Sequence, residues 1–358
     1  MTISLCMIVK NEESILRRCL DSIKNAVDEI IIIDTGSKDN TKLIALEYTN
    51  YVYDFSWIDD FSAARNFAYS KAIMDYQMWL DADDIVPKET NDGIIKLKND
   101  IDNSYDMITM KYITHFDKNN NPVHSTTRER LTKRHANFIW KDPVHEYIAL
   151  SGKILHTDME IHHKKPKEKQ DHARNLNIYA QLEEASHNFT PRQMYYFARE
   201  LKDHMKFEKS VYYFEKFLES KKGWNEDNIA TCFNLSFCYQ RTGKNNKILQ
   251  ILLKSFEYDA PRAENCCQIG YYYKNLKQYA LAYKWFDIAA NLKPPKSLGF
   301  ILWDYWGYIP NIECFSCLCE LKNYNQAAEY NKKAAEYKPD SIAVAINKSF
   351  LEASLKTL

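Results

Sequence analysis

The segment YQMWLDADD, residues 76–84, places three carboxylates within four residues, directly after an apolar stretch of strand length. Charged side chains next to a buried core are costly unless something positive or water lies against them. Three kinds of partner are therefore open for these carboxylates: an arginine or lysine, a bound cation, or solvent at the end of the strand.

The segments before this one alternate between strand-like and helix-like patterns. The run begins with ISLCMIV (3–9), which is apolar and of strand length, continues with helical spacing in EESILRRCLDSI (12–23), and returns to a β-branched run in EIIIIDTGS (29–37). This alternation predicts an α/β domain with an open, mostly parallel sheet and helices on both of its faces. Ligands of such sheets bind beyond the carboxyl ends of the strands.

Polar clusters follow three of these strands. They are KNEE (10–13), DTGSKDN (34–40) and DADD (81–84). Because carboxyl ends of parallel strands share one edge, we expect the three clusters to open onto one rim. The alternative is that these residues only form turns, for which Asp, Asn and Gly are common. The high acid content favours a binding site.

The second half of the chain is helical from about Pro191 and has a period near 34 residues, as in tetratricopeptide repeats. The clearest copy has Gly270, Tyr273, Ala282, Phe286, Ala289 and Pro294 at the characteristic positions, and a later copy has Ala327, Ala334 and Pro339. An aromatic insert at residues 299–310 interrupts the spacing. We therefore expect an α/β domain at 1–165, a helical connector at 166–190 and a repeat domain at 191–358.

Composition narrows the class of protein. Lys and Arg total 48 and so do Asp and Glu, which gives no electrostatic footprint for nucleic acid. Nine cysteines, scattered through apolar helical segments, indicate reduced thiols and a reducing compartment. No stretch approaches the roughly 20 apolar residues that span a bilayer. We expect a soluble cytoplasmic protein.

The chain lacks the usual backbone devices for binding phosphate. Neither GxxxxGK[ST] nor GxGxxG follows a strand, and there are only eight glycines. A metal and a cationic side chain are then needed to hold phosphate groups. The two Asp residues of DAD offer oxygen ligands suited to Mg²⁺. Arg65 is the candidate cation, and the alternative is that it pairs with Asp59 or Asp60 on a surface helix.

In their order along the chain, MIVKNEE, IIIIDTGSKDNT, DDFSAARN and WLDADD resemble the nucleotide-sugar half of family 2 glycosyltransferases. The fold of that family is called GT-A, and the resemblance covers residues 1–165. Together with the helical repeats, the chain is similar to a bacterial and phage branch that includes peptide S-glycosyltransferases.

The resemblance implies a UDP-sugar donor, with a hexose as the sugar, and Mn²⁺ or Mg²⁺ as the cofactor. It implies donor contacts from Glu12, Asp34, Thr35, Ser37, Arg65 and Asp81. It implies metal contacts from Asp83 and from a histidine at the end of a later strand. His162 and His163 are adjacent there, and because side chains alternate along a strand only one can point inward. We favour His163.

An inverting transfer needs a base that deprotonates the acceptor. We expect Glu146, in the WKDPVHEYI segment, to be that base and Asp84 to be the second candidate. The alternative is that Glu146 pairs structurally with His145 or Arg128. The acceptor is open: a Cys or Ser of a peptide or protein, a glycan or a cell-envelope molecule.

The repeats have three possible roles. Their concave surface suits a peptide or protein partner, but they can also brace the first domain or form a homodimer. Two other classes of protein compete with the glycosyltransferase. One is a nucleotidyltransferase, which would be expected to have a further carboxylate pair or a basic phosphate loop, and the other is a non-catalytic repeat scaffold.

Overall fold

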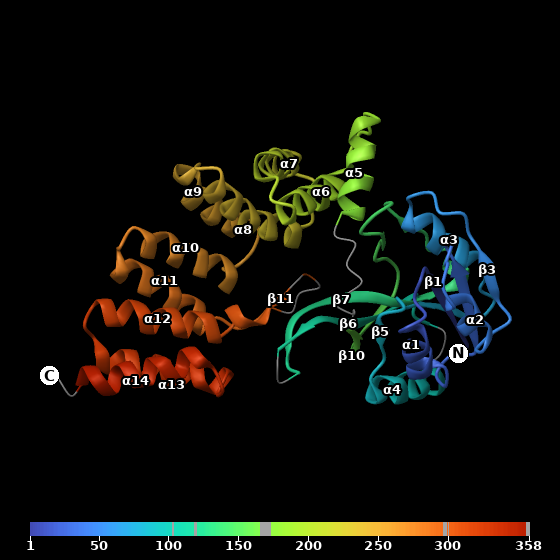
Figure 1. Ribbon diagram of the computed structural model, residues 1–358, viewed down its shortest axis with the longest axis horizontal. Coiled ribbons are helices and arrows are strands. Elements are labelled where there is room, and N and C mark those ends of the chain that lie inside the picture. Colours follow the sequence, from blue (N-terminus) through green and yellow to red (C-terminus); the bar gives the residue numbers. More distant parts are fainter. Residues whose placement is uncertain (102–103, 118–119, 165–172, 296–298, 300, 356–358) are drawn as a thin grey trace. The chain divides into compact units, whose positions relative to one another are not determined.

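The computed structural model describes residues 1–101, 104–117, 120–164, 173–295, 299 and 301–355. It divides into two compact units, Met1–His187 and Asn188–Leu358 (Figure 1). Helix α5 (Arg174–Glu184), which lies within the expected connector, is part of the first unit. Residues 165–172 of that connector lie outside the described residues.

The first unit contains a mostly parallel sheet, as expected. Its strands are β1 (Ile3–Val9), β2 (Glu29–Asp34), β3 (Val52–Asp54), β4 (Tyr76–Trp79), β5 (Asp84–Ile85), β6 (Met107–Phe116), β7 (Pro122–Lys133) and β10 (Ile154–His163). Their order across the sheet is β3-β2-β1-β4-β7-β6-β10-β5. The pairs β2–β3, β1–β2, β1–β4 and β6–β10 are parallel, whereas β7 is antiparallel to both β4 and β6.

Helices cover both faces of this sheet. The helices are α1 (Leu16–Ile23), α2 (Thr41–Leu46), α3 (Phe61–Lys71) and α4 (Lys88–Asp100), and a short hairpin is formed by β8 (Trp140–Lys141) and β9 (Tyr147–Ile148). Alternate residues of β1 point to opposite faces of the sheet and belong to two separate hydrophobic cores. Leu5 packs in the core with α1, α2 and α4, and Cys6 packs in the core with α3 and the hairpin. The expected α/β layering is confirmed.

The second unit consists of successive helices. They are α6 (Pro191–Asp203), α7 (Phe207–Glu219), α8 (Asn225–Arg241), α9 (Ile248–Lys254), α10 (Ala263–Asn275), α11 (Tyr279–Asn291), α12 (Tyr308–Glu320), α13 (Tyr324–Tyr337) and α14 (Ile342–Leu355). Neighbours pack as α6 on α7, α8 on α9, α10 on α11 and α12 on α13 (Figure 1). The repeat positions Gly270, Ala282, Phe286 and Ala289 are fully buried. This confirms the expected tetratricopeptide-like helical repeats.

The aromatic insert packs onto helices of its own unit. The indole Nε1 of Trp306 donates to Glu264 Oε1 at 2.9 Å, and the backbone N–H of Leu302 reaches the same oxygen at 3.3 Å. The ring of Tyr305 lies edge-on to that of Phe233, with centroids 6.0 Å apart. Trp303 remains 37% exposed. The insert therefore contributes Trp306 to the core of the repeats.

Most of the cysteines are buried. All nine are free, and every one except Cys319 is buried. Burial raises the pKa of each thiol, for example that of Cys266 to about 12. Within the described residues, no helix has the length and apolar content to cross a membrane.

Gly270 tests the packing of the repeats. A Cβ added there would lie 2.7 Å from the buried Phe286 ring, a clash that costs about 1–3 kcal/mol and opposes a helix-propensity gain of about 1 kcal/mol. We expect Gly270→Ala to lower the free energy of unfolding by on the order of 1 kcal/mol, measured by urea denaturation.

The matched control is Phe286→Leu, alone and together with Gly270→Ala. Because the smaller side chain makes room for the added methyl group, the double variant should lose less stability than the sum of the two single losses. Simple additivity would mean that the two residues do not clash.

Candidate functional site

The loops that follow β1 and β2 are joined by hydrogen bonds. Asn11 N–H donates to Ser37 Oγ at 2.9 Å, and Lys38 N–H donates to Asn11 Oδ1 at 2.8 Å. Glu12 N–H donates to Thr41 Oγ1 at 2.6 Å. The two loops therefore form one ledge beyond the strand ends, and this ledge carries the expected donor residues Glu12 and Ser37.

Asp34 and Thr35 shape the second of these loops. Oδ1 of the buried Asp34 accepts the backbone N–H groups of Gly36 and Ser37, both at 2.7 Å. Gly36 has a φ of +99°, a conformation that favours glycine. Thr35 Oγ1 donates to the Val9 carbonyl at 3.1 Å, so it ties β2 to β1. Both residues lie on the rim, where they order the loop.

The carboxylates of residues 81–84 have different partners. Asp84 is fully buried, and its Oδ2 lies 3.2 Å from Nη1 of the equally buried Arg130. Tyr112 OH donates to Asp84 Oδ1 at 2.8 Å, and the N–H of Asp81 donates to Oδ2 at 3.1 Å. An arginine is therefore the partner of the deepest carboxylate.

This enclosure does not favour Asp84 as the second candidate base. A base must reach the proton it removes. The Asp84 carboxylate instead faces Arg130 and Tyr112 inside the protein, with no exposed surface. We therefore assign it a role in holding the 81–84 turn.

Arg130 was not identified from the sequence. Its guanidinium lies 3.8 Å from the centroid of the Trp79 ring and 4.3 Å from that of Tyr112, and it donates to the Trp79 carbonyl at 3.2 Å. The available signal was the TTRERLTK segment, because Arg128 and Arg130 are two residues apart in a strand and so point to the same face.

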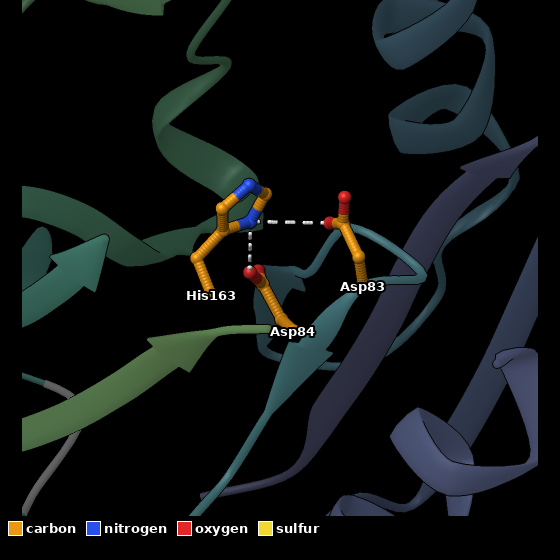
Figure 2. Close-up of side chains that lie close together, drawn as sticks. All are labelled: Asp83, Asp84 and His163. Carbon is orange, nitrogen blue, oxygen red and sulfur yellow. Dashed lines mark hydrogen bonds and ion pairs between the residues drawn. The ribbon is translucent and has the colours of Figure 1, made fainter. Parts of the chain in front are cut away.

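Asp83 and His163 lie together at the opening of this turn (Figure 2). His163 Nδ1 is 3.2 Å from Asp83 Oδ1 and 3.4 Å from Asp84 Oδ1. His162 pairs instead with Glu160, at 3.1 Å. Burial lowers the pKa of His163, but hydrogen bonds to Asp83 and Asp84 outweigh it and raise the pKa to about 10. Without a metal, His163 is thus a cation between two carboxylates.

The same three side chains fit a divalent cation. One ligand atom from each of Asp83, Asp84 and His163 lies within 4.8 Å of the others. Asp83 Oδ1 is buried and faces His163 Nδ1 at 3.2 Å. Two carboxylates and one imidazole are ligands that Mg²⁺ or Mn²⁺ accepts. The site therefore has the donors needed for the expected metal.

Arg65 connects two carboxylates from distant parts of the chain. It is only 5% exposed, its Nη2 donates to Asp81 Oδ1 at 2.7 Å and its Nε donates to Glu146 Oε1 at 2.6 Å. Asp60 instead caps α3, and Asp59 accepts from the Trp57 indole. The alternative of a surface pairing with Asp59 or Asp60 is therefore wrong.

The pKa of Asp81 reflects its ion pair with Arg65. Burial raises the pKa of the Asp81 carboxyl, but the Arg65 guanidinium outweighs burial and the pKa falls to about 2. Asp81 is therefore ionised at neutral pH, with its side chain 34% exposed at the rim.

Glu146 lies in a loop that is held from several sides. The N–H of Phe61 donates to the Pro143 carbonyl at 2.9 Å, and Arg128 Nη2 donates to the Glu146 carbonyl oxygen at 3.3 Å. His145 has a φ of +54°, which is unusual for a residue with a Cβ. The Glu146 side chain is 13% exposed and pairs with Arg65. Arg128 contacts the backbone carbonyl of Glu146, whereas the side chain that pairs with the Glu146 carboxylate is Arg65 and not Arg128.

Comparison with known proteins identifies the first unit. Residues 4–154 match the family model described as Glycosyl transferase family 2. The chain therefore carries a family 2 glycosyltransferase domain, and the GT-A-like sheet described above belongs to it.

Three curated relatives are similar to parts of the chain. The glycosyltransferase SunS of Bacillus subtilis (strain 168), derived from the SPbeta prophage, is 25% identical over 285 residues, 76% of this chain and 65% of the relative. A TPR repeat-containing protein of Synechococcus elongatus is 51% identical over 82 residues, 23% and 20% of the two chains. An uncharacterized glycosyltransferase of Rickettsia felis is 36% identical over 92 residues, which make up 26% of this chain and 32% of the relative. The chain spans less than two thirds of the length of each relative.

The pair of Arg130 and Asp84 gives a stability prediction. Replacing Arg130 by Met keeps much of the volume but leaves Asp84 buried without its cation, a loss of about 3–5 kcal/mol in other buried pairs. We expect Arg130→Met to lower the urea midpoint strongly. The control is Arg17→Met, which removes an exposed pair with Glu47 and should leave the midpoint nearly unchanged. Equal shifts would contradict the structural role of Arg130.

Proposed function

We propose that this chain, whose first unit contains a family 2 glycosyltransferase domain, is a metal-dependent inverting glycosyltransferase that moves a sugar from a UDP-sugar to an acceptor. Residues 1–165 would form the catalytic domain, 166–190 the connector and 191–358 the repeat domain. The observation that carries the proposal is the meeting of two groups on one rim: the Asp83, Asp84 and His163 cluster, and the Arg65 pair with Asp81 and Glu146.

The donor would bind across the rim. The ledge with Glu12, Asp34, Thr35 and Ser37 lies at the ends of neighbouring strands, where nucleotides bind in open α/β sheets. Asp81 would contact the ribose side of the donor. The Arg65 guanidinium would face the diphosphate, whose negative charge needs a fixed cation.

Asp83 and His163 would hold the divalent cation, with Asp84 beneath them. The cation would supply positive charge against the diphosphate of the donor. On the protein's side, Arg130 and Tyr112 fix Asp84 and so keep the turn in place for Asp83.

Glu146 is the proposed base. Its carboxylate would take the proton of the acceptor nucleophile while that nucleophile attacks the anomeric carbon and the bond from this carbon to UDP breaks. Support comes from its position beside Arg65 and Asp81, in a loop whose backbone is fixed by Phe61 and Arg128.

We propose a peptide or protein acceptor, modified on a Cys or Ser, because stacked helix pairs present an extended surface of the kind that holds peptides. The similarity to SunS spans 285 residues, more than the glycosyltransferase domain alone. A glycan or cell-envelope acceptor is the competing outcome. The repeats can also support a homodimer, and we place the reaction in the cytoplasm.

Hydrolysis of a panel of nucleotide sugars, with and without Mn²⁺, tests the donor and the metal. We expect release of UDP from one UDP-sugar that depends on the metal.

Asp83→Asn removes a charged metal ligand and should abolish Mn²⁺-dependent UDP binding in titration calorimetry. Lys111 pairs with the exposed Asp158, so Asp158→Asn is the matched control and should bind normally. Unchanged affinity in Asp83→Asn would refute the metal assignment.

Glu146→Gln tests the base. The amide keeps the size of the side chain but cannot accept the proton, so transfer should fall by about 10²-fold or more while the affinity for UDP stays near that of the unmodified protein. Steady-state transfer assays and calorimetry measure the two quantities. Loss of UDP binding would instead make Glu146 a donor ligand, and full turnover would exclude it as the base.

A further inference from the structure

Resting on the glycosyltransferase function proposed above, we propose that Arg65 is a positioning residue that couples proton transfer at Glu146 to the departure of UDP. One buried guanidinium serves the base on one side and the leaving group on the other. Before the reaction its positive charge interacts with the Glu146 carboxylate. As the reaction proceeds, it interacts more strongly with the negative charge that forms on UDP.

The geometry of Arg65 supports two simultaneous roles. Nε donates a hydrogen bond to Glu146 at 2.6 Å, and Nη2 donates one to Asp81 at 2.7 Å. Nη1 is buried and has no hydrogen-bond partner among the described residues. A buried donor without a partner is costly, so a ligand oxygen that accepts from it would be stabilised. Nη1 is therefore the one nitrogen of Arg65 without an acceptor among the described residues, and a donor oxygen that reaches it would satisfy it.

Aromatic rings keep the guanidinium in place. Its central carbon lies 4.7 Å from the centroid of Trp79 and 4.8 Å from that of Trp140. Trp79 belongs to the strand that leads into Asp81, and Trp140 to the hairpin that leads into the Glu146 loop. Arg65 is thus fixed by the same two elements whose carboxylates it joins.

The local charges explain the coupling. Asp81 and Glu146 share one positive charge, so the three groups together have a net charge of −1. When the acceptor's proton moves to Glu146, that carboxylate becomes neutral and its electrostatic attraction to Arg65 is lost. In the same step the electron pair of the bond between the anomeric carbon and UDP passes to a UDP oxygen. The freed charge of Arg65 then faces the charge that forms, which stabilises the transition state more than the ground state.

Arg65→Lys separates charge from geometry. Lysine keeps the positive charge, but its single ammonium group does not reproduce the planar fork that reaches both carboxylates and a ligand. The matched control is Arg134→Lys. Arg134 belongs to the same unit and donates from Nε to the Met74 carbonyl at 2.8 Å; its contacts within the described residues include neither Asp81 nor Glu146.

The experiment is a double-mutant cycle in the full chain, using the UDP-sugar that the panel identifies. We expect Arg65→Lys to lower kcat by about 10²-fold and to change the affinity for UDP by less than about 3-fold, since the contact strengthens only in the transition state. Combined with Glu146→Gln, it should lower kcat by no more than about a further 3-fold, because the coupling is already lost. Arg134→Lys should leave kcat unchanged in both backgrounds.

Other outcomes would overturn the coupling. A UDP affinity at least 10-fold weaker with unchanged kcat would make Arg65 a donor ligand alone, and multiplicative losses in the double variant would make the two residues independent. If thermal melting shows that Arg65→Lys is unfolded, Arg65→Gln takes its place; because it also removes the charge, the affinity for UDP should fall as well, and the coupling is then tested by whether Glu146→Gln lowers kcat by no more than about a further 3-fold in that background. Absence of turnover in the unmodified protein would overturn the proposed function itself, which distinguishes that failure from a failure of the coupling.

Discussion

The buried pair of Asp84 and Arg130 is the constraint on which the rim depends. Moving two charges out of water is costly, and the cost is offset only when both ions find good partners inside the protein. Here Tyr112 and the Asp81 N–H donate to the carboxylate. On the side of the arginine, Nη1 donates to the Trp79 carbonyl and the Trp79 and Tyr112 rings lie against the guanidinium, while Nε and Nη2 have no hydrogen-bond partner among the described residues. The pair therefore fixes the path of the 81–84 turn. Asp81 and Asp83, which lie on the outer side of this turn, are positioned as a consequence.

Sheet topology brings the arginine to that turn. Strand β7 runs antiparallel between β4 and β6 and pairs with β4 through Met78 and Leu131. This register places Arg130, the neighbour of Leu131, beside the end of β4 and under the acidic turn. An additional parallel strand would have directed its carboxyl end to the rim. The antiparallel strand instead provides side chains along its length, and one of them neutralises the deepest carboxylate.

Local patterns in the sequence were sufficient for the alternation of strands and helices up to β4, the three polar clusters and the helical repeats, but not for the strands between residues 84 and 148. They also favoured His163 over His162, because strand alternation allows only one inward side chain, and the structure places His163 beside Asp83. They were not sufficient for Arg130, or for the partner of Arg65. Glu146 is 81 residues away from Arg65, and pairings over such separations depend on tertiary packing, which no local period encodes. The burial of Asp84 was missed for the same reason.

The balance of charges also bears on the need for a metal. The rim brings together the carboxylates of Asp81, Asp83, Asp84 and Glu146, and the side chains that pair with them are Arg65, Arg130 and His163. Even with His163 protonated, four negative charges face three positive ones. A diphosphate adds further negative charge, which would be repelled at close range in a partly buried site. Under the proposed function, an additional cation would offset this repulsion, and Asp83 is the carboxylate of this group that pairs with no arginine among the described residues. On this argument, the arginines organise the site and leave one position where a divalent cation would be most strongly favoured.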